Sequence, residues 1–440
     1  MIMKKIATLL LAGMALITMA SCGSTTSSTP ESLSLDDSGN VVFDHVSITY
    51  GNPITGADGT AMRQLVSRFN ELYEGQINVT ETFMTETEYY ESLLLTIPMK
   101  RAFDIALVHS YKIAGFANKG LLTPLQGIID TADINIQRED YIESVYDSMY
   151  FEDMLYGIPL DIHTIVLYYN QDLLDQYSLD VPTNRGELIA AAQAMPNNST
   201  SGWGLPLATT WPSEYTFTTA LYQNGGLEID EEGAPAYNTA AGVTALQMVS
   251  DLIHTYHVSP TNVSVDSDLM LFNQGKAMFH INGDWMLNSV VESGVNFGVT
   301  TLSKMFTTNY ETDYASDIAA RSHCFVLPDG RNDSIKQQAA LVFAKYITEN
   351  ASLWAEQGGH VPASNIARAT QEYLDLPHHE HYGDVNHFRL NATSPYYYEA
   401  FSPVFSRVTT ALTTPGYDAM SLLDEAVAEG IQLVAEAKQS

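Results

Sequence analysis

The stretch VSITYGNPITGADGTAMRQLVSRFNELYEGQINVTETFM, residues 46–84, alternates between strand-like and helix-like patterns. The β-branched run at 46–51 predicts a strand, and residues 77–84 predict a second one. Between them, residues 60–73 predict an amphipathic helix, because apolar side chains recur at helical spacing. These side chains are Met62, Leu65, Val66, Phe69, Leu72 and Tyr73. Strands that alternate with helices favour parallel pairing, so this stretch predicts an α/β fold.

The same alternation continues along the chain. Residues 103–109 (FDIALVH) predict another strand, and residues 240–257 and 334–357 predict long helices. Residues 156–177 (YGIPLDIHTIVLYYNQDLLDQY) predict a strand-rich crossover that ends in a helix. The chain has 440 residues, whereas one hydrophobic core stops growing at roughly 250 to 300 residues. We therefore expect two lobes.

The composition is strongly acidic. Asp and Glu number 52 against 20 Lys and Arg, and the formal net charge is -32. Such a field repels the phosphate backbone of nucleic acids. We therefore expect no nucleic-acid partner, although the charge says little about the ligand because charged surfaces are mostly just solvated.

The N-terminus has the pattern of an export signal. Lys4 and Lys5 precede an apolar run, residues 6–20, which is shorter than the ~20 residues that span a bilayer comfortably. A short apolar run behind a basic start predicts a signal peptide, and we place it at residues 1–21.

The cysteine that follows this segment predicts a lipid anchor. Met19-Ala20-Ser21-Cys22 resembles a bacterial lipobox, with Met at a position where Leu is usual. The resemblance implies cleavage before Cys22 and its lipidation; the alternative is a cysteine that happens to follow a signal peptide. Lipidation would leave Cys324 as the only thiol, without an intramolecular disulfide. The polar residues after Cys22 predict a flexible tether, so residues 22–42 would link the lipid to the folded body.

Two loops are candidates for ligand contact. In open α/β sheets, ligands bind beyond the carboxyl ends of the strands. Residues 52–59 follow the first predicted strand, and residues 109–112 follow the third. Both loops lead into predicted helices, whose first N–H groups can donate to hydroxyls or anions.

Five stretches resemble a known family when they are taken in order. They are YGIPLDIHTIVLYYNQDLL, FNQGKAMFHINGDW, NFGVTTLSK, CFVLPDG with the helix AALVFAKYIT, and WAEQGGHVPAS. The resemblance is to the extracellular solute-binding proteins of carbohydrate ABC importers, the group that includes maltose-binding protein. It covers nearly the whole chain from about Val46 to the end.

The resemblance implies a two-lobed α/β periplasmic-binding-protein type II fold with three hinge crossings. The crossings would fall near 161–164, 319–323 and 357–362. Lobe 1 would then comprise residues 43–161 plus 323–357, and lobe 2 would comprise residues 164–320 plus 360–440. Closure of the lobes around the hinge would enclose the ligand.

The implied function is that of a binding protein without enzymatic activity or cofactor. It would capture a sugar or oligosaccharide between the lobes and deliver it to an ABC permease. We expect a monomer, lipid-anchored on the extracytoplasmic face of the membrane, either at the cell surface or in the periplasm. The alternatives are a binding protein for glycerol phosphate or another polar solute, a surface glycosidase and a scaffolding lipoprotein. The nucleotide-binding motif GxxxxGK[ST] and the hydrolase motifs GxSxG and HExxH are absent from the sequence.

Aromatic side chains are the first candidates for sugar contact, because a sugar packs its flat C–H face on an aromatic ring. Trp285 matches the stacking tryptophan of the family and lies in the turn Gly283-Asp284-Trp285; packing between helices is the alternative. Tyr215 matches a second stacking aromatic, although ordinary packing is as good an explanation. Trp203 and Trp211 are further candidates that no spacing argument separates from packing.

Polar candidates come from the hinge and from the two loops. Asp161 and His163 lie in the first crossing, where they have either a ligand-binding or a hinge-structural role. The loops contribute Thr55, Asp58, His109, Ser110 and Tyr111. Asp58 is alternatively the cap of the helix that follows it. His360 stands where relatives often have tyrosine facing the cleft.

Charge near these positions favours a neutral ligand. Lys112 and Arg321 are the only basic residues near the loops, whereas a phosphate is usually met by bidentate arginine or several cations. The segment 378–387 holds four histidines with Glu380 and Asp384 between them. Such a cluster can bind zinc or nickel, but adjacent loop histidines more often bind nothing tightly, and we expect no metal site.

Overall fold

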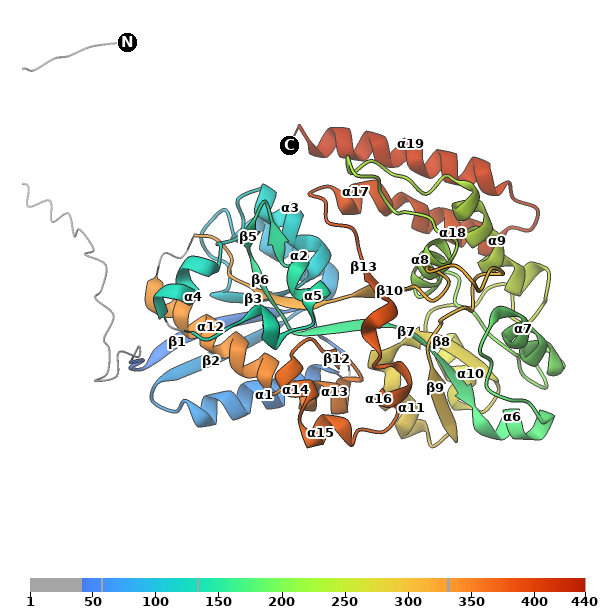
Figure 1. Cartoon of the computed structure of the whole chain (residues 1–440), viewed down its shortest axis with the longest axis horizontal. Coiled ribbons are helices and arrows are strands. Elements are labelled where there is room, and N and C mark those ends of the chain that lie inside the picture. Colours follow the sequence, from blue (N-terminus) through green and yellow to red (C-terminus); the bar gives the residue numbers. More distant parts are fainter. Residues whose placement is uncertain (1–41, 57, 133, 331–332, 440) are drawn as a thin grey trace, which may run out of the picture. The chain divides into compact units, whose positions relative to one another are not determined.

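The structure is a computed structural model that describes residues 42–439 apart from 57, 133, 331 and 332 (Figure 1). The predicted signal peptide, the lipidated Cys22 and nearly all of the predicted tether lie outside these described residues.

Five described strands form the first sheet, in the order β2-β1-β3-β11-β6. They are β2 (Ile77–Phe83), β1 (Val46–Asn52), β3 (Ile105–His109), β11 (His323–Val326) and β6 (Gly157–Pro159). The predicted parallel pairing is confirmed for β1 with β2 and β3, whereas β11 runs antiparallel to β3 and β6. The predicted helix is α1 (Asp58–Leu72), which buries Met62, Leu65, Val66 and Phe69. Leu72, at the end of α1, is exposed instead.

The second sheet is built around one long strand, β7 (Asp161–Asn170). Its other described strands are β12 (Val361–Pro362), β10 (Ile318–Arg321), β13 (Phe388–Leu390), β8 (Phe279–Gly283) and β9 (Phe297–Thr300). All four strands that pair with β7 run antiparallel to it, and only β10 and β13 pair in parallel. An expectation of parallel pairing throughout is therefore wrong for this sheet. A separate hairpin joins β4 (Tyr150–Phe151) and β5 (Met154–Leu155).

Side chains of β7 alternate between two hydrophobic cores. Ile162, Val166 and Tyr168 belong to one core, and Ile165 and Leu167 belong to the other. This follows from the two-residue period of a strand, which sends successive side chains to opposite faces. A single strand thus contributes to both cores.

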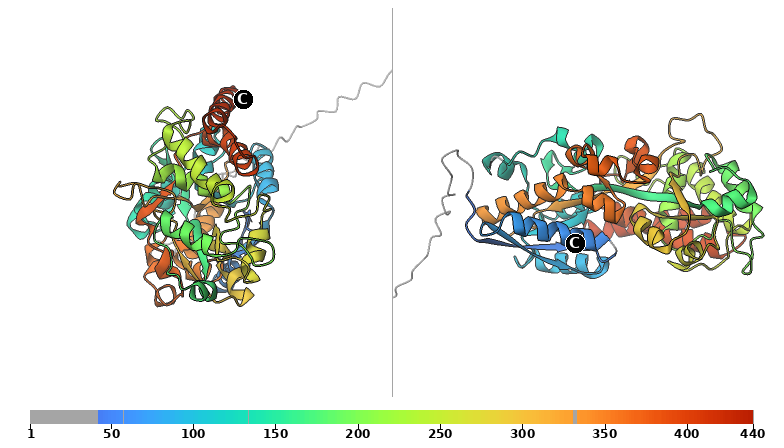
Figure 2. Two further views of the ribbon diagram at one scale, coloured as in Figure 1. Left: turned by 90° about the vertical axis from the view of Figure 1, so that its right-hand side faces the viewer. Right: turned by 90° about the horizontal axis from the view of Figure 1, so that it is seen from below.

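Helices cover both sheets (Figures 1 and 2). In the first lobe, α1 contacts β2, and α12 (Ser334–Glu349) lies beside α1 and contacts β1. In the second lobe, α8 (Ser213–Gln223) packs on α9 (Ala240–His254) and on β10. The C-terminal α19 (Ala419–Ala437) contacts further helices, namely α9, α17 (Tyr397–Phe401) and α18 (Pro403–Thr413).

The remaining described helices are short. They are α2 (Glu86–Thr96), α3 (Ile113–Asn118), α4 (Gln126–Ala132), α5 (Glu143–Asp147), α6 (Gln171–Tyr177), α7 (Arg185–Ala194), α10 (Ser267–Asn273), α11 (Leu287–Ser293), α13 (Ser352–Gly358), α14 (Asn365–Arg368), α15 (Gln371–Leu374), α16 (His379–Tyr382), and the 3-10 turns η1 (Ser110–Lys112), η2 (Arg138–Asp140), η3 (Asp284–Met286) and η4 (Val385–His387). Within residues 42–439, no helix combines the length and apolar character needed to cross a membrane.

The chain changes sheets where the first two hinge crossings are predicted. It leaves the first sheet after β6 and enters the second at β7, with only Leu160 between them. It returns between β10 and β11 through Ser322, and α13 later leads to β12, which pairs with β7. The lobe limits at 161, 320, 323, 357 and 360 remain our proposal.

Candidate functional site

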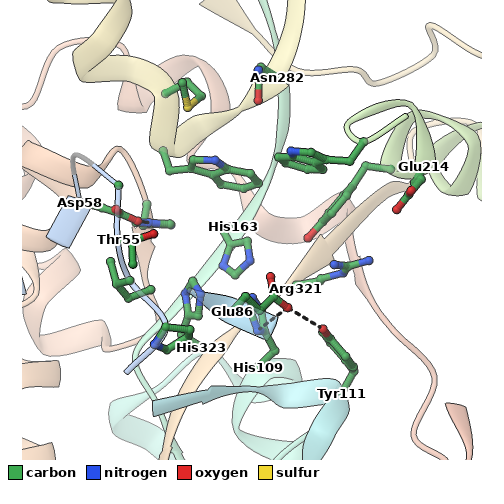
Figure 3. Close-up of a pocket in the computed structure, with 18 of the residues that line it drawn as sticks. Thr55, Asp58, Glu86, His109, Tyr111, His163, Glu214, Asn282, Arg321 and His323 are labelled. Atoms are coloured by element: carbon green, nitrogen blue, oxygen red, sulfur yellow. Dashed lines mark hydrogen bonds and ion pairs between the residues drawn. The ribbon is translucent and has the colours of Figure 1, made fainter. Parts of the chain in front are cut away.

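A cavity of about 730 Å³ is the main candidate site (Figure 3). This volume lies within the range of roughly 300 to 1,000 Å³ that is typical of small-molecule pockets. The loop after β1, the end of β3, β7, β8, β10 and β11 all contribute to its wall. The lining residues are Pro53, Ile54, Thr55, Gly56, Asp58, Glu86, His109, Tyr111, His163, Trp211, Glu214, Tyr215, Val265, Asp266, Asn282, Trp285, Met286, Arg321, His323, His360, Tyr397, Tyr398, Phe401, Ser402 and Phe405.

Two indole rings lie nearly parallel among the aromatic side chains of the wall. The ring planes of Trp211 and Trp285 lie 12° apart, with centroids separated by 5.5 Å. Tyr215 meets both rings edge-on, at centroid distances of 5.7 Å from Trp211 and 6.4 Å from Trp285. Both tryptophans are only half-buried and line the cavity, so part of each ring is accessible to a ligand.

Gly283 makes room for the Trp285 ring. It ends β8, and a Cβ atom built at this position would overlap the indole of Trp285. The η3 turn that follows carries Trp285 back over the strand end. A glycine before the turn is therefore required by the close approach of the ring to the backbone.

Polar groups surround the rings. Asp58 and Glu214 lie on opposite sides of the cavity, with His163 between them (Figure 3). Burial raises the pKa of the Glu214 carboxyl, against the opposing charge of Arg321. The Arg321 guanidinium lies over the Tyr215 ring at 4.2 Å and over the Tyr111 ring at 5.1 Å. Carboxylates and a held guanidinium can accept from and donate to sugar hydroxyls.

The carboxylate of Asp161 lies beneath the cavity in a histidine cluster. Its Oδ1 is 3.0 Å from His163 Nδ1, and its Oδ2 is 2.9 Å from His323 Nδ1. The backbone N–H of His323 also donates to Oδ1, and Trp354 Nε1–H donates to Oδ2 at 2.8 Å. Asp161 is fully buried, so these donors replace the water that the carboxylate would otherwise bind.

Burial and neighbouring charges together set the pKa values of this cluster. Burial alone would raise the pKa of Asp161, but the neighbouring charges of His323, His163 and His360 hold it well below its usual range. Burial would lower the pKa of His323, but the charge and hydrogen bond of Asp161 raise it. Burial lowers the pKa of His163 to about 3, helped by the charge of His323. At neutral pH the cluster therefore holds an ionised Asp161 and a neutral His163.

His109 is held at the end of β3 by a hydroxyl group. Tyr90 Oη lies 2.7 Å from His109 Nδ1 and accepts a hydrogen bond from the His109 backbone N–H. Burial lowers the pKa of His109 well below its usual value, and the charge of His323 acts in the same direction. Its ring packs 4.6 Å from that of His323, which connects the strand end to the cluster.

Eight of the ten residues predicted to bind ligand line this cavity. They are Trp285, Tyr215, His163, His109, Tyr111, Thr55, Asp58 and His360. Asp161 does not line it, because its carboxylate is turned into the histidine cluster. Ser110 does not line it either; it is buried at the start of η1, where its backbone N–H donates to Ser322. Ligand binding by all ten residues remains a prediction.

Several lining residues were not among those ten. They include Trp211, Glu86, Glu214, Asn282, Arg321 and His323. The sequence offered no spacing signal that separates Trp211 from ordinary packing. Asp58 is the first residue of α1, and its Oδ1 accepts from the adjacent Gly59 N–H, whereas a capping side chain accepts from the N–H two or three residues on. Its Oδ2 lies 3.4 Å from His360 Nε2.

Two of the four histidines in the segment 378–387 pack against other side chains. His379 is buried, with Nε2 3.2 Å from Tyr382 Oη, and His378 stacks on Phe297 at 4.7 Å. His381 remains half-exposed. The segment therefore does not present its imidazoles as one set.

The chain belongs to the bacterial extracellular solute-binding protein family, whose family model matches residues 64–381. This confirms the resemblance seen in the sequence and implies an extracytoplasmic location. Its named relatives are binding proteins.

Two relatives show how far the similarity extends. A maltotriose-binding protein of Pyrococcus abyssi is 24% identical over 229 residues, which is 51% of this chain and 47% of that protein. The match therefore spans about half the length of that relative. A galactooligosaccharide-binding protein of Bacillus subtilis is 23% identical over 373 residues, which is 82% of this chain and 80% of that protein.

The fold is also found in solved structures. An ABC substrate-binding protein from Listeria monocytogenes in complex with cycloalternan matches with a TM-score of 0.75 at 19% identity. The match covers 89% of this chain and 100% of that one. It confirms the predicted two-lobed α/β fold.

Proposed function

We propose that this chain captures a sugar or oligosaccharide in the cavity and delivers it to the permease of an ABC importer. The observation that carries the proposal is the pair of nearly parallel indoles, Trp211 and Trp285, in a cavity that carboxylates and a guanidinium also line. Sugars offer an apolar C–H face and a rim of hydroxyls, and this wall complements both. The named relatives bind maltotriose and galactooligosaccharide, which supports the same class of ligand.

We assign the stacking contacts to the aromatic residues and the hydroxyl contacts to the polar ones. Trp285, Trp211 and Tyr215 would pack against sugar faces. The polar contacts would come from Thr55, Asp58, His109, Tyr111, His163 and His360, with Glu86, Glu214 and Arg321 in addition. Asp161 and Ser110 would act from behind the wall, by holding its residues in place.

The charge of the wall favours a neutral sugar over glycerol phosphate. Among the described residues that line the cavity, Arg321 is the only arginine or lysine, whereas Asp58, Glu86, Glu214 and Asp266 bring carboxyl groups. Phosphate is usually met by bidentate arginine or by several cations. A phosphate group would therefore meet net repulsion here.

A ligand screen tests this proposal. The purified protein would be incubated with neutral mono- and oligosaccharides and with glycerol phosphate, and its melting temperature followed. A neutral sugar should raise the melting temperature without producing new reducing ends, because bound ligand stabilises only the native state. New reducing ends would favour a surface glycosidase, a shift with glycerol phosphate alone would favour the polar-solute alternative, and no shift with any compound would favour a scaffold.

The same proposal places the protein on the membrane. Cleavage before Cys22 and lipidation of that cysteine would tether a monomer to the outer side of the membrane, within reach of the permease. In cells, the wild-type protein should partition with membranes, whereas Cys22→Ser should be released into the soluble extracytoplasmic fraction. Membrane association that survives Cys22→Ser would contradict the lipid anchor without affecting the assignment of sugar binding.

A further inference from the structure

Four buried side chains bring potential metal ligands to one place beneath the cavity. Asp161 and His163 come from β7, His323 from β11, and His360 directly precedes β12. One ligand atom from each residue lies within 4.8 Å of the others. All four residues are at most 5% exposed. Three of them also line the cavity, namely His163, His323 and His360, which leaves an entry path for an ion.

The three imidazoles present the same atom to the carboxylate. The Nδ1 atoms lie 3.0 Å from Asp161 Oδ1 for His163, 2.9 Å from Oδ2 for His323 and 3.7 Å from Oδ2 for His360. Three imidazole nitrogens around one carboxylate are a donor set that suits zinc and other first-row transition metals. In a hydrogen-bonded network the imidazole protons would lie on the Nδ1 atoms that face the carboxylate. In a metal site those Nδ1 atoms are unprotonated and bind the ion.

One part of the cluster lacks the donors that a hydrogen-bond network requires. No described residue hydrogen-bonds to His360 Nδ1 or to Asp284 Oδ1, although both atoms are buried. These two atoms lie 3.8 Å apart, and Asp161 Oδ2 is also close to His360 Nδ1. When His360 Nε2–H donates to Asp58, Nδ1 is left with a lone pair that faces two carboxylate oxygens. A cation among these atoms would give His360 Nδ1 and Asp284 Oδ1 the partner that each lacks, and buried polar atoms without a partner are costly.

Hydrogen bonds from neighbouring groups hold Asp161 and His360 in place, as such bonds orient the ligands of known metal sites. Trp354 Nε1–H and the His323 backbone N–H donate to Asp161 and would continue to do so with an ion bound. Asp58 Oδ2 lies 3.4 Å from His360 Nε2, which is the carboxylate–histidine arrangement that orients metal-bound imidazoles. The ligands are thus positioned by groups that do not need to move.

We propose that Asp161, His163, His323 and His360 form a binding site for a divalent transition-metal ion. Zn²⁺ is the ion that this donor set suits best. Each neutral imidazole would carry its single proton on Nε2, leaving the Nδ1 lone pair for the ion. The ion would tie together β7, β11 and the segment before β12, which are far apart in the sequence. This proposal is independent of the identity of the sugar.

Cobalt provides the first test, because tetrahedral Co²⁺ has visible ligand-field bands and replaces Zn²⁺ in such sites. The chelator-treated, sugar-free protein would be titrated with Co²⁺. We expect one equivalent to bind with tetrahedral bands, and His163→Gln and His360→Gln each to weaken binding by more than about 100-fold. Loss of a residue that only orients a metal ligand costs about 10- to 100-fold, and this is the effect expected for Asp58→Asn, since Asp58 contacts His360 Nε2.

His381→Gln is the matched control, since His381 lies in the half-exposed surface segment outside the cluster. It should leave the titration unchanged. A wild-type protein that binds no Co²⁺ in tetrahedral form would overturn the proposal. So would a titration that His381→Gln abolishes and His360→Gln does not.

X-ray absorption of Zn²⁺ bound to the His381→Gln protein gives a readout that needs no change in the cluster. We expect three imidazole ligands at the usual Zn–N distance of about 2.0 to 2.1 Å, with one carboxylate oxygen. Fewer than three imidazoles would refute the site as proposed, even if the cluster variants fail to fold.

Discussion

The indole planes of Trp211 and Trp285 lie within 12° of each other, with ring centroids 5.5 Å apart, although 73 residues separate them in the chain. Trp211 precedes α8, and Trp285 lies in the turn after β8. The two rings reach the same cavity from different elements of the second lobe. Their alignment gives a sugar two apolar faces of nearly the same orientation.

Removing one of these faces should weaken sugar binding. Trp285→Ala is expected to cost roughly 1 to 3 kcal/mol of binding free energy, the scale of burying one aromatic face. Titration calorimetry with the best sugar from the screen measures it. Trp203→Ala is the control, because Trp203 is half-buried but does not line the cavity. Equal affinity of the Trp285→Ala variant and the wild type would remove Trp285 from the site.

The absence of a side chain at Gly283 should be necessary for the contact between Trp285 and the sugar. In Gly283→Ala the new methyl group overlaps the Trp285 ring, so the indole must move, and we expect weaker sugar binding together with a lower melting temperature. Gly127→Ala is the comparison, because no atom lies within 4 Å of a Cβ built there, inside α4. Because Gly127 lies in the first turn of α4, alanine there should leave sugar binding unchanged and should not lower the melting temperature. A Gly283→Ala protein with unchanged affinity and stability would show that the ring does not depend on this close approach.

The hydrogen bond that the Trp354 indole donates to Asp161 should stabilise the folded protein. Trp354→Phe removes the N–H that donates to the fully buried carboxylate of Asp161. Hydrogen bonds to charged groups contribute about 1.5 to 3 kcal/mol, so the free energy of unfolding should fall by about that amount. Urea denaturation in the presence of a chelator measures the change without any contribution from bound metal. Trp203→Phe should change it little, and a Trp354→Phe protein as stable as the wild type would contradict the role of this hydrogen bond.

A second buried carboxyl should make stability depend on pH. Burial raises the pKa of Asp268 from 3.8 to about 6. Because the native state holds this proton more tightly than the unfolded state, the contribution of Asp268 is greatest below pH 4. It decreases as the pH rises and becomes constant above about pH 6, a change of about 3 kcal/mol.

The difference between the wild type and Asp268→Asn isolates this group. The free energy of unfolding of the wild type, measured relative to that of the variant, should decline from pH 4 to pH 7. The same substitution type at exposed Glu292, Glu292→Gln, serves as the control for general charge effects. A flat difference for Asp268→Asn would mean that the carboxyl is not buried as described. His280 Nδ1, 3.4 Å away, is the neighbour that could otherwise pair with it.

Local patterns in the sequence were sufficient for the fold class and for part of the site. The strand at 46–51 and the helix after it follow from β-branched residues and helical spacing, and both are present as β1 and α1. The turn Gly283-Asp284-Trp285 likewise marked a ring that is not wholly buried. The antiparallel pairing around β7 was not predictable in this way, because strand direction depends on how the chain returns to the sheet.

The sequence by itself determined which residues can form strands and helices, and which loops follow the carboxyl ends of the first strands. Such information is contained in neighbours a few residues apart. Asp161 and His163 are neighbours on one face of β7, but only the tertiary structure brought His323 and His360 to them, and Trp211 beside Trp285. His323 and His360 lie more than 150 positions from Asp161, and these contacts depend on the strand crossings and on packing rather than on local spacing.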